Sequence, residues 1–470
     1  MSTPTPTPNA LTSLSALPLT PHEGWGRYPR LRARAARPAR ADALPPLLEA
    51  ARAEGLRALP FGLGRSYGDA ALLEGGLALH TRGLREVLSF DPSTGWARCE
   101  AGVSIDDLIR RFAPEGFFPP VVPGTKFVTL GGALANDIHG KNHHQDGTLA
   151  DHVRSVEILT ASGEVVVCDA HHTPELFWAT VGGLGLTGVI LRLEVRLAPI
   201  EGVGIEMESI RVRDLDHFFE VSAESGGFTH TVSWIDCVKQ GAGMGRGIFM
   251  RGRHSAEPPR AGLIGGVMGA LSPLMQVPVS MPNALLNPLT IRAFNEAYFR
   301  KHPPRPLRRV VGFDPFFFPL DAVGGWNKIY GRRGFLQWQM VVPHEPNHRA
   351  VRRVLQEITA AGMGSFLAVI KEFGEGVHPH LSFPMPGVTL ALDFPNYGPD
   401  LLALLTRLDR VVMEVGGRVY LGKDARLPLA HFREMYPAWG AWREVRDRWD
   451  PDGRFSSALG ARLGLCGAPA

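Results

Sequence analysis

The chain contains 470 residues, 44% of them hydrophobic, and its 50 basic and 46 acidic residues give a formal charge of +4. This length exceeds the size at which one hydrophobic core keeps growing, so we expect two domains. Because the basic residues are spread along the sequence, the composition argues against nucleic acid as a partner.

The N-terminus and the cysteines indicate the compartment. Residues 1–20 are rich in Thr, Pro and Ser and lack the basic and apolar runs of a signal peptide, which predicts a disordered leader. The four cysteines lie far apart and form no CxxC pair, so neither a zinc site nor a disulfide framework is expected. This pattern fits a reducing, cytoplasmic location.

Residues 44–197 alternate short apolar runs with glycine-rich turns and short helices, which is typical of an α+β fold. Ser104, followed three residues later by Asp107, predicts the N-cap of an amphipathic helix. Further on, VRSVEILTASGEVVV predicts a β-hairpin that turns at Ser162 and Gly163.

The strongest local signal is the segment LPFGLGRSYGDA, in which Gly62, Gly64 and Gly68 follow an apolar strand. Such glycines allow consecutive backbone N–H groups to converge into a nest that binds a pyrophosphate without a lysine. The GxGxxxG spacing differs from the Rossmann fingerprint, and no helical pattern follows. A glycine-rich turn without a ligand is the alternative, and the local sequence leaves both open.

A second glycine-rich segment, PGTKFVTLGGALANDIHGKNHH, begins at Pro123. Its few bulky residues would allow the backbone to approach a flat ligand closely. The histidines His139, His143 and His144 raise the hypothesis of a metal site. The nearby carboxylates follow no recognised ligand spacing, however, so no metal is expected.

Residues 261–291 form a long uncharged stretch that glycines and prolines interrupt, which argues against a membrane-spanning helix. Two interpretations stay open. The stretch is either a mobile apolar loop or a lid that touches a lipid tail or a membrane surface.

A duplicated β-α-β unit follows. In the first copy, the strand FLQWQMVV precedes a helix over residues 347–361, the terminator Gly362 and the strand SFLAVIKEF. In the second copy, TLALDF precedes a helix over residues 399–415, the terminator Gly416 and the strand RVYLGK. Two such units predict an antiparallel sheet with helices on one face, the ferredoxin-like arrangement.

Each second strand of this repeat ends in a lysine, Lys371 or Lys423. In FLQWQMVV, period-two alternation places Gln337 and Gln339 on one face and the apolar side chains on the other. The amides are either ordinary solvated positions or the lining of a polar pocket, and the spacing does not decide between them.

Several segments together resemble a known family. These are GLGRSYGD, VTLGGALANDIHGKNHH, DHVRSVEILTASGE, ELFWATVGGLGLTGVI, FLQWQ and YLGKDAR. They are similar to the FAD-dependent oxidoreductases of the vanillyl-alcohol-oxidase type and, within that family, look most like the polyprenylphosphoryl-ribose oxidases, the flavin subunits of two-component epimerases. The similarity covers nearly the whole chain after the leader.

The resemblance implies an α+β fold in which residues 21–200 and 415–470 form the FAD-binding domain and residues 201–414 form an inserted substrate-binding domain, with residues 261–291 as a mobile segment over the pocket. It implies two groups of cofactor-binding residues. The pyrophosphate group is Gly62, Leu63, Gly64, Arg65, Ser66, Tyr67, Gly68 and Asp69. The second group is Gly124, Thr129, Leu130, Gly131, Gly132, Asn136, Asp137, Ile138, His139, Ile190 and Tyr420.

His139 occupies a plausible position for the covalent flavin bond of some relatives, but the closer relatives imply non-covalent FAD. Lys423 matches the active-site lysine of the family, whose ammonium would stabilise negative charge that develops on the flavin. Tyr67, Gln337, Gln339 and Lys371 match positions that line the substrate pocket. Neutral Lys423, Tyr67 or a water molecule would accept the proton of the oxidised hydroxyl, and the sequence does not choose among them.

The implied reaction is oxidation of the ribose C2 hydroxyl of a polyprenylphosphoryl-β-D-ribose to the 2-keto sugar, with quinone or oxygen as the final acceptor and a short-chain reductase as partner. The alternatives are a soluble sugar, alditol or aldonolactone oxidase and a non-catalytic flavoprotein. Ala391, Thr389 and the pair Phe317-Phe318 depart from the family pattern and imply a more apolar, thiol-free pocket. Peripheral contact with the inner face of the membrane is compatible with this assignment.

Overall fold

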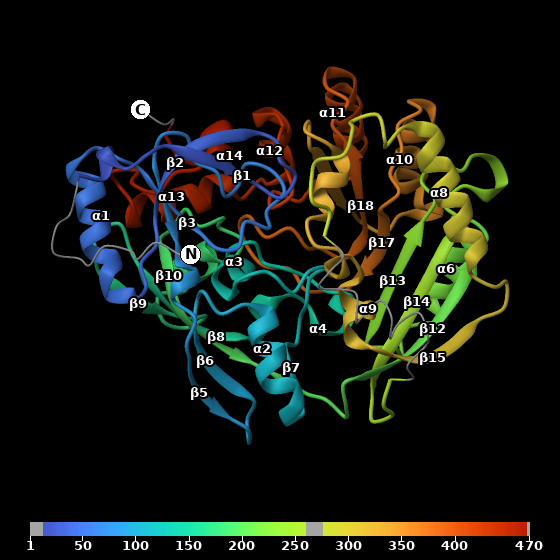
Figure 1. Ribbon diagram of the computed structural model, residues 1–470, viewed down its shortest axis with the longest axis horizontal. Helices are drawn as coiled ribbons and strands as arrows, with labels where there is room; N and C mark the ends of the chain where they lie inside the picture. Colours follow the sequence, from blue (N-terminus) through green and yellow to red (C-terminus); the bar gives the residue numbers. More distant parts are fainter. Residues whose placement is uncertain (1–12, 260–275, 468–470) are drawn as a thin grey trace.

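The computed structural model describes residues 13–259 and 276–467, and their helices and strands form two regions (Figure 1). One region contains the N-terminal part of the chain, coloured from blue to green, together with the red C-terminal helices, and the other is built on a large sheet coloured from green to orange. The mixture of antiparallel sheets, parallel pairs and helices confirms the predicted α+β fold.

The first region contains two main sheets. The smaller sheet has the order β1 (Thr20–Glu23), β2 (Arg30–Ala36), β4 (Leu77–His80), β3 (Ala58–Phe61), and its last three strands are parallel. The larger sheet is antiparallel, with the order β5 (Val87–Asp91), β6 (Trp96–Glu100), β10 (Val189–Arg196), β8 (Val153–Leu159), β9 (Val165–Cys168). A short pair joins β7 (Phe117–Phe118) to β11 (Ala198–Pro199).

The helices of this part are α1 (Leu44–Ala53), α2 (Ile105–Phe112), α3 (Leu130–Ala135), α4 (His143–Asp146) and α5 (Pro174–Thr180). Two local predictions are confirmed. Ser104 caps α2 through a reciprocal capping box with Asp107, and β8 and β9 form a hairpin in which Gly163 has a φ of 91°.

The C-terminal helices α12 (Leu429–Met435), α13 (Trp439–Trp449) and α14 (Ala458–Arg462) lie with the N-terminal part of the chain (Figure 1). The indole N–H of Trp442 on α13 donates a 2.8 Å hydrogen bond to the carbonyl of Ala179 on α5. Phe455 forms a β-bridge with Ala58 of β3. These contacts support the predicted return of the chain to the first domain, while the domain borders stay a prediction.

The second region is one eight-stranded antiparallel sheet. Its strand order is β15 (Leu307–Gly312), β12 (Gly204–Val212), β14 (Gly247–Ser255), β13 (His230–Ile235), β17 (Ala368–Phe373), β18 (Gly387–Pro395), β16 (Phe335–Val342), β19 (Arg418–Val419). The helices of this region are α6 (Leu215–Ala223), α8 (Pro288–Lys301), α9 (Phe313–Phe317), α10 (Arg349–Ala360) and α11 (Pro399–Met413).

The predicted repeat is confirmed as β16-α10-β17 and β18-α11-β19. In the sheet order β17-β18-β16-β19, a strand of one unit separates the two strands of the other, as in the ferredoxin-like arrangement. Gly362 and Gly416 follow the two helices with φ of 65° and 71°. Two details differ from the prediction. Helix α10 begins at Arg349 rather than at residue 347, because the two preceding residues have positive φ, and Lys423 lies in a turn closed by its N–H and the carbonyl of Tyr420.

Helices α6, α10 and α11 cover one face of this sheet and bury its apolar side chains, including Leu336, Trp338 and Met340 of β16. Trp338 is only 2% exposed. The predicted alternation is therefore confirmed for this strand, and the opposite face of the sheet is left to line a cavity.

Two segments predicted to lack structure contain ordered residues. In the leader, Leu14 is buried, and the backbone N–H groups of Leu14 and Ser15 donate to the carboxylate of Glu54, so this part of the leader is ordered. In the uncharged stretch, Asn287 caps α8 at Pro288, because its side chain accepts bonds from the first turn. Residues 1–12 and 260–275 of these two segments lie outside the described residues. No helix in the described ranges is long and apolar enough to cross a membrane.

Candidate active site

Both regions line one cavity of about 1400 Å³. Pockets for a single small molecule commonly measure about 300–1,000 Å³, so this cavity has room for a large ligand and a second, smaller one. Six Lys or Arg side chains are among the described lining residues, whereas Asp321 is the one acidic side chain among them. The cavity therefore favours anionic ligands.

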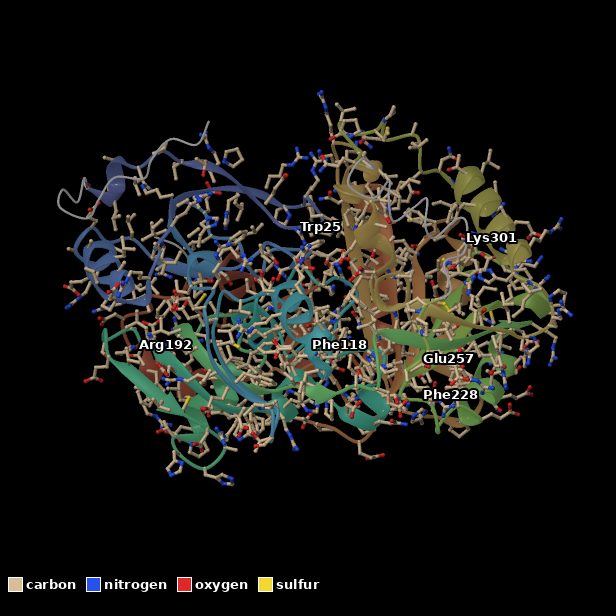
Figure 2. All side chains as sticks on the ribbon, turned by 60° about the horizontal axis from the view of Figure 1, so that its bottom comes forward. Trp25, Phe118, Arg192, Phe228, Glu257 and Lys301 are labelled. Carbon is tan, nitrogen blue, oxygen red and sulfur yellow. The ribbon has the colours of Figure 1, made fainter. Side chains whose placement is uncertain are left out.

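The loop after β3 leaves the backbone N–H groups of the predicted nest unpaired. Its N–H groups from Leu63 to Ser66 donate no hydrogen bond within residues 13–259 and 276–467. On the other side of the loop, the N–H of Trp25 donates to the carbonyl of Ser66 at 2.8 Å, and the guanidinium of Arg65 lies 4.1 Å from the Trp25 ring. Figure 2 shows Trp25 at the junction of the two regions. Free amides beside a cation are the groups that an anion site requires.

The second glycine-rich segment provides no such nest. The N–H groups of Leu130 and Gly131 donate to the carbonyls of Val103 and Ala101 at 2.8 and 2.9 Å, so they are not available to a ligand. Close approach of this segment to a flat ligand therefore does not depend on free amides near residue 131, because a neighbouring loop already satisfies the start of α3. This segment contributes open space to the cavity instead, since a Cβ on Gly124 would meet no atom within 4 Å.

Most of the expected cofactor and substrate residues line the cavity. They are Gly62, Leu63, Gly64, Arg65, Ser66, Tyr67, Gly124, Thr129, Gly131, Gly132, Asn136, Ile138, His139, Ile190, Tyr420, Gln337, Gln339, Lys371 and Lys423. Four expected residues do not line it. They are Gly68, Asp69, Leu130 and Asp137. Leu130 is buried in the core, and Asp137 accepts a 2.6 Å hydrogen bond from the hydroxyl of Ser382.

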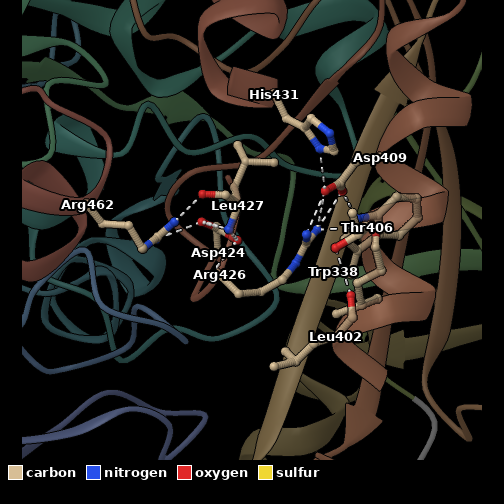
Figure 3. Close-up of polar contacts among 10 residues, drawn as sticks. Trp338, Leu402, Thr406, Asp409, Asp424, Arg426, Leu427, His431 and Arg462 are labelled. Atoms are coloured by element: carbon tan, nitrogen blue, oxygen red, sulfur yellow. Dashed lines mark hydrogen bonds and ion pairs between the residues drawn. The ribbon is translucent and has the colours of Figure 1, made fainter. Parts of the chain in front are cut away.

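Gly68 and Asp69 instead join the nest to the loop that carries Lys423. A Cβ on Gly68 would overlap the carbonyl oxygen of Asp424, and Arg462 donates to the carboxylates of both Asp69 and Asp424 at 2.8 Å. Figure 3 shows Asp424 between Arg462 and the backbone N–H of Leu427. This clamp fixes two distant loops relative to each other. Sequence reasoning missed Arg462, which has no local signal for such a role.

Arg426 holds the far side of the same loop. It pairs with Asp409 of α11, whose fully buried carboxylate also accepts the indole N–H of Trp338 at 3.0 Å (Figure 3). The loop of Lys423 is thereby tied to the sheet as well as to the nest. Removing one partner of such a buried pair would leave a charge without compensation and would destabilise the fold.

Lys423 lines the cavity and interacts electrostatically with the carboxylate of Asp393, which is fully buried and does not line the cavity. The Nζ atom of Lys423 lies 4.0 Å from the centre of the Tyr67 ring. Burial lowers the pKa of Lys423, Asp393 opposes this shift, and Lys371 adds to it. Burial likewise raises the pKa of Asp393, which accepts a 2.5 Å hydrogen bond from the amide of Gln337. Sequence reasoning missed Asp393, although alternation in TLALDF places it on the face of Thr389 and Ala391.

Tyr67 is a hydrogen-bond donor rather than a base. Burial raises the pKa of its hydroxyl well above the usual value, and the carboxylate of Asp393 raises it further. The phenol therefore stays protonated at neutral pH. Of the two side chains expected to accept a proton, only Lys423 has a pKa shifted towards neutrality.

His139 and Gln339 form a fixed pair on the floor of the cavity. The amide N–H group of Gln339 donates to His139 Nε2 at 2.9 Å and to Thr389 Oγ1 at 3.1 Å. Burial lowers the pKa of His139 well below its usual value, and Lys371 contributes, so the imidazole is neutral and accepts this bond. No group of three or more metal-ligating side chains occurs in the part of the chain that the structure describes.

Lys371 and Lys141 bring two enclosed cations to one end of the cavity. Lys371 donates to the carbonyl of Gly140 at 3.2 Å, and Lys141 donates to the carbonyl of Phe316 at 2.6 Å. Burial lowers the pKa of Lys371 to about 8 and, with the repulsion of Lys371, that of Lys141 to about 7. Neither forms an ion pair with a carboxylate among the described residues, and both donate to backbone carbonyls instead. An anion between them would raise both pKa values and so hold both amines in their charged form. Sequence reasoning missed Lys141.

Comparison with known proteins identifies the family. Residues 33–169 match the model of an FAD binding domain, and residues 388–463 match that of D-arabinono-1,4-lactone oxidase. The chain is 39% identical to decaprenylphosphoryl-β-D-ribose oxidase of Mycolicibacterium smegmatis over 86% of this chain and 88% of that protein. The chain belongs to the family of this FAD-dependent oxidase. It is 33% identical to an uncharacterized protein of Streptomyces coelicolor over 77% of this chain and 100% of that protein.

A more distant relative matches a smaller part of the chain. Cytokinin dehydrogenase 2 of Arabidopsis thaliana is 29% identical over 29% of this chain and 27% of its own length. The similarity to decaprenylphosphoryl-β-D-ribose oxidase therefore extends across both regions, whereas this relative shares only a portion of about 136 residues. The protein is an FAD-dependent oxidoreductase of the expected family.

The cavity of this oxidase fits FAD. The free amides of the nest, with Arg65 beside them, match a pyrophosphate. Deeper in the cavity, the buried Oδ1 atom of Asn136 has no hydrogen-bond partner among the described residues, and the polar edge of a flavin ring carries a donor that would satisfy it. Gly124 leaves open space beside this wall. These residues would hold FAD between the nest and the large sheet.

Proposed function

We propose that the protein oxidises the C2 hydroxyl of the ribose in a polyprenylphosphoryl-β-D-ribose to the 2-keto sugar. The observation that carries this proposal is the pair Lys141 and Lys371, two cations without a carboxylate partner in the cavity that also holds Lys423. A sugar phosphate would place its anion between the pair and its hydroxyl near Lys423. The similarity to decaprenylphosphoryl-β-D-ribose oxidase supports the same substrate class.

Bound FAD would supply the hydride acceptor for the carbinol carbon. The hydroxyl must also lose its proton, and Lys423 in its neutral form takes that proton on Nζ. The ammonium that results stabilises the negative charge that develops where the hydride is accepted. Tyr67 donates from its hydroxyl and Gln337 from its amide, and both orient the sugar.

The proposal is tested by anaerobic flavin bleaching. The FAD-loaded protein is mixed with farnesylphosphoryl-β-D-ribose, farnesylphosphoryl-arabinose, free ribose or an alditol, and the flavin absorbance is followed. We expect rapid bleaching with the phosphoribosyl compound and none with the free sugars. Bleaching by a free sugar alone would contradict the proposal.

A second candidate is an aldonolactone oxidase that uses oxygen and releases hydrogen peroxide. The match of residues 388–463 to the D-arabinono-1,4-lactone oxidase model favours it. A neutral lactone has no group to compensate Lys141 and Lys371, which is why we place this candidate second. Peroxide release with free lactones in air, at rates above those with phosphoribosyl lipids, would support it.

We also propose that FAD is bound non-covalently. The Nε2 atom of His139 already accepts the amide N–H of Gln339, which leaves only Nδ1 for a bond to a flavin. Flavin should therefore stay in the supernatant after acid precipitation of the protein. Yellow colour that remains with the washed pellet would contradict this.

The keto sugar product must be reduced to complete an epimerisation, and we propose that a separate short-chain reductase, as a partner, carries out this step. Its addition with NADH should convert the ketone to the arabinose epimer.

We propose, finally, that the protein works at an anionic membrane surface, since its substrate is a lipid. The edge formed by the end of α8 and the start of β15 supports this proposal. Lys301, Arg305 and Arg309 are exposed there, and Leu289 and Phe294 of α8 are 75% and 47% exposed. We expect Lys301→Ala to weaken sedimentation with phosphatidylglycerol vesicles by about fivefold. The exposed Lys239→Ala variant serves as control. Equal sedimentation of both variants and wild type would refute this surface.

A further inference from the structure

The cavity face of the large sheet changes character along its width. Its strands β16, β18 and β17 carry mainly polar side chains into the cavity, namely Gln337, Gln339, Thr389 and Lys371. The strands β13, β14 and β12 carry apolar ones, namely Val232, Trp234, Met250 and Met207. Val232 and Met250 are direct cross-strand partners. The polar side chains of β16, β18 and β17 suffice to bind a sugar. The apolar side chains of β13, β14 and β12 therefore have no role in the reaction described above.

Helix α9 supplies the opposite wall of this apolar half. Phe316 and Phe317 line the cavity, and both are almost fully buried. Lys141 donates to both of their carbonyls, at 2.6 and 3.3 Å, and so fixes the helix at the boundary with the polar half. We call the space between these walls the apolar corridor. Its walls are Val232, Trp234, Met250, Met207, Phe316 and Phe317.

Basic side chains stand at both ends of the apolar corridor. Lys141 and Lys371 lie at its inner end. Lys301 and Arg309 line the same cavity and are exposed, so the cavity reaches the surface beside them. Figure 2 shows Lys301 at the outer side of the second region. An apolar passage that begins at an anion site and ends at a basic surface matches a lipid phosphate, with its anion inside and its chain leading outward.

We propose that the apolar corridor binds the first isoprene units of the lipid tail, and that the tail leaves the protein past Lys301 and Arg309. The inference rests on the proposed function, because it requires the phosphate to lie near Lys141 and Lys371. It adds a specificity site, since a tail in the corridor lowers KM in proportion to its apolar surface without contacting the reacting carbon.

The first test compares two substrates of the FAD-loaded protein, methylphosphoryl-β-D-ribose and farnesylphosphoryl-β-D-ribose. The methyl compound ends at the phosphate, whereas the farnesyl compound adds three isoprene units. We expect KM for the farnesyl compound to be lower by roughly tenfold or more, with a similar kcat. Equal KM values for the two substrates would overturn the inference.

The second test uses the variant Met250→Gln and its matched control Met244→Gln. Both methionines are partly buried, but Met244 packs against the far core and does not line the cavity. Met250→Gln should raise KM for the farnesyl compound roughly tenfold and leave KM for the methyl compound unchanged. Met244→Gln should change neither. An equal rise for both substrates in Met250→Gln would speak against a tail site.

Binding of farnesyl phosphate separates this inference from the proposed function. If neither ribose compound is oxidised, the proposed function fails, and calorimetric titration with farnesyl phosphate then decides the inference. Binding to the wild-type protein that weakens in Met250→Gln, but not in Met244→Gln, supports the apolar corridor. Absence of binding, or equal affinity in all three proteins, overturns it.

Discussion

The two walls of the cavity recognise their ligands by different means. The wall of the first region consists of glycine-rich loops and offers backbone N–H groups, whereas the wall of the second region is a sheet face that offers side chains. Backbone groups match the constant pyrophosphate of a cofactor, and side chains can be exchanged to suit a substrate. We therefore expect changes in the sheet to alter chemistry and substrate choice, and changes in the loops to alter FAD affinity.

The largest effect should come from Lys423→Ala. Loss of the group that accepts the proton should slow anaerobic flavin reduction by about 10²–10⁴-fold, while the protein remains yellow. Stopped-flow absorbance measures the rate, and the exposed Lys239→Ala variant controls for loss of a lysine. If flavin is lost in parallel with activity, Lys423 belongs to the cofactor wall and the comparison fails.

A smaller effect is expected from Lys371→Met, which removes one of the two cations of the anion site. Loss of a charged hydrogen bond to the phosphate should raise KM for a phosphoribosyl substrate roughly ten- to a hundredfold, with less change in kcat. Lys328→Met is a matched control, because Lys328 also donates to a backbone carbonyl but does not line the cavity. A fall in kcat at unchanged KM would assign Lys371 to the chemistry instead.

The loop wall is probed by Gly124→Val. Because a Cβ at Gly124 meets no atom of the protein within 4 Å, the new side chain should leave the fold intact and collide only with bound FAD. We expect the Kd for FAD to rise about tenfold and the thermal stability of the apoprotein to stay unchanged. Gly226→Val is the control, since Gly226 also faces open space but lies off the cavity. Unchanged FAD affinity would show that the cofactor does not bind beside Gly124.

The sequence predicted most elements that depend on local patterns. The capping box at Ser104, the hairpin at Gly163, the ferredoxin-like repeat and the alternation in β16 are confirmed, because each follows from neighbouring residues or from a fixed period. The nest at residues 62–66 also follows from its own glycines.

Features that depend on distant contacts were missed or misassigned. Arg462 binds both Asp69 and Asp424, and Asp69 lies almost 400 residues before it in the chain. This contact gives Asp69 a structural role outside the cavity. Nothing in the sequence around Leu130 and Gly131 indicates that their N–H groups donate to the carbonyls of another loop. The position of Asp393 on its strand could be read from the sequence. Its effect on the pKa of Lys423 could not, because only the fold brings the two residues close together.

The smallest expected effect, Asp393→Asn, is the sharpest test of the sheet wall. Neutral Lys423 is the reactive form, so the rate of flavin reduction should rise with pH through the pKa of Lys423, which burial has lowered from its ordinary value near 10.4. The carboxylate of Asp393 opposes that shift. Its replacement by an amide should therefore move the midpoint of the profile to lower pH.

The asparagine oxygen still accepts the amide N–H of Gln337, so the geometry of the wall is preserved while its charge changes. Flavin reduction from pH 6 to 10 measures the midpoint, and FAD affinity, set by the other wall, should stay constant. A midpoint that stays in place, or moves to higher pH, would show that Lys423 does not supply the titrating group. The proton would then have to leave through water, since Tyr67 is held in its protonated form.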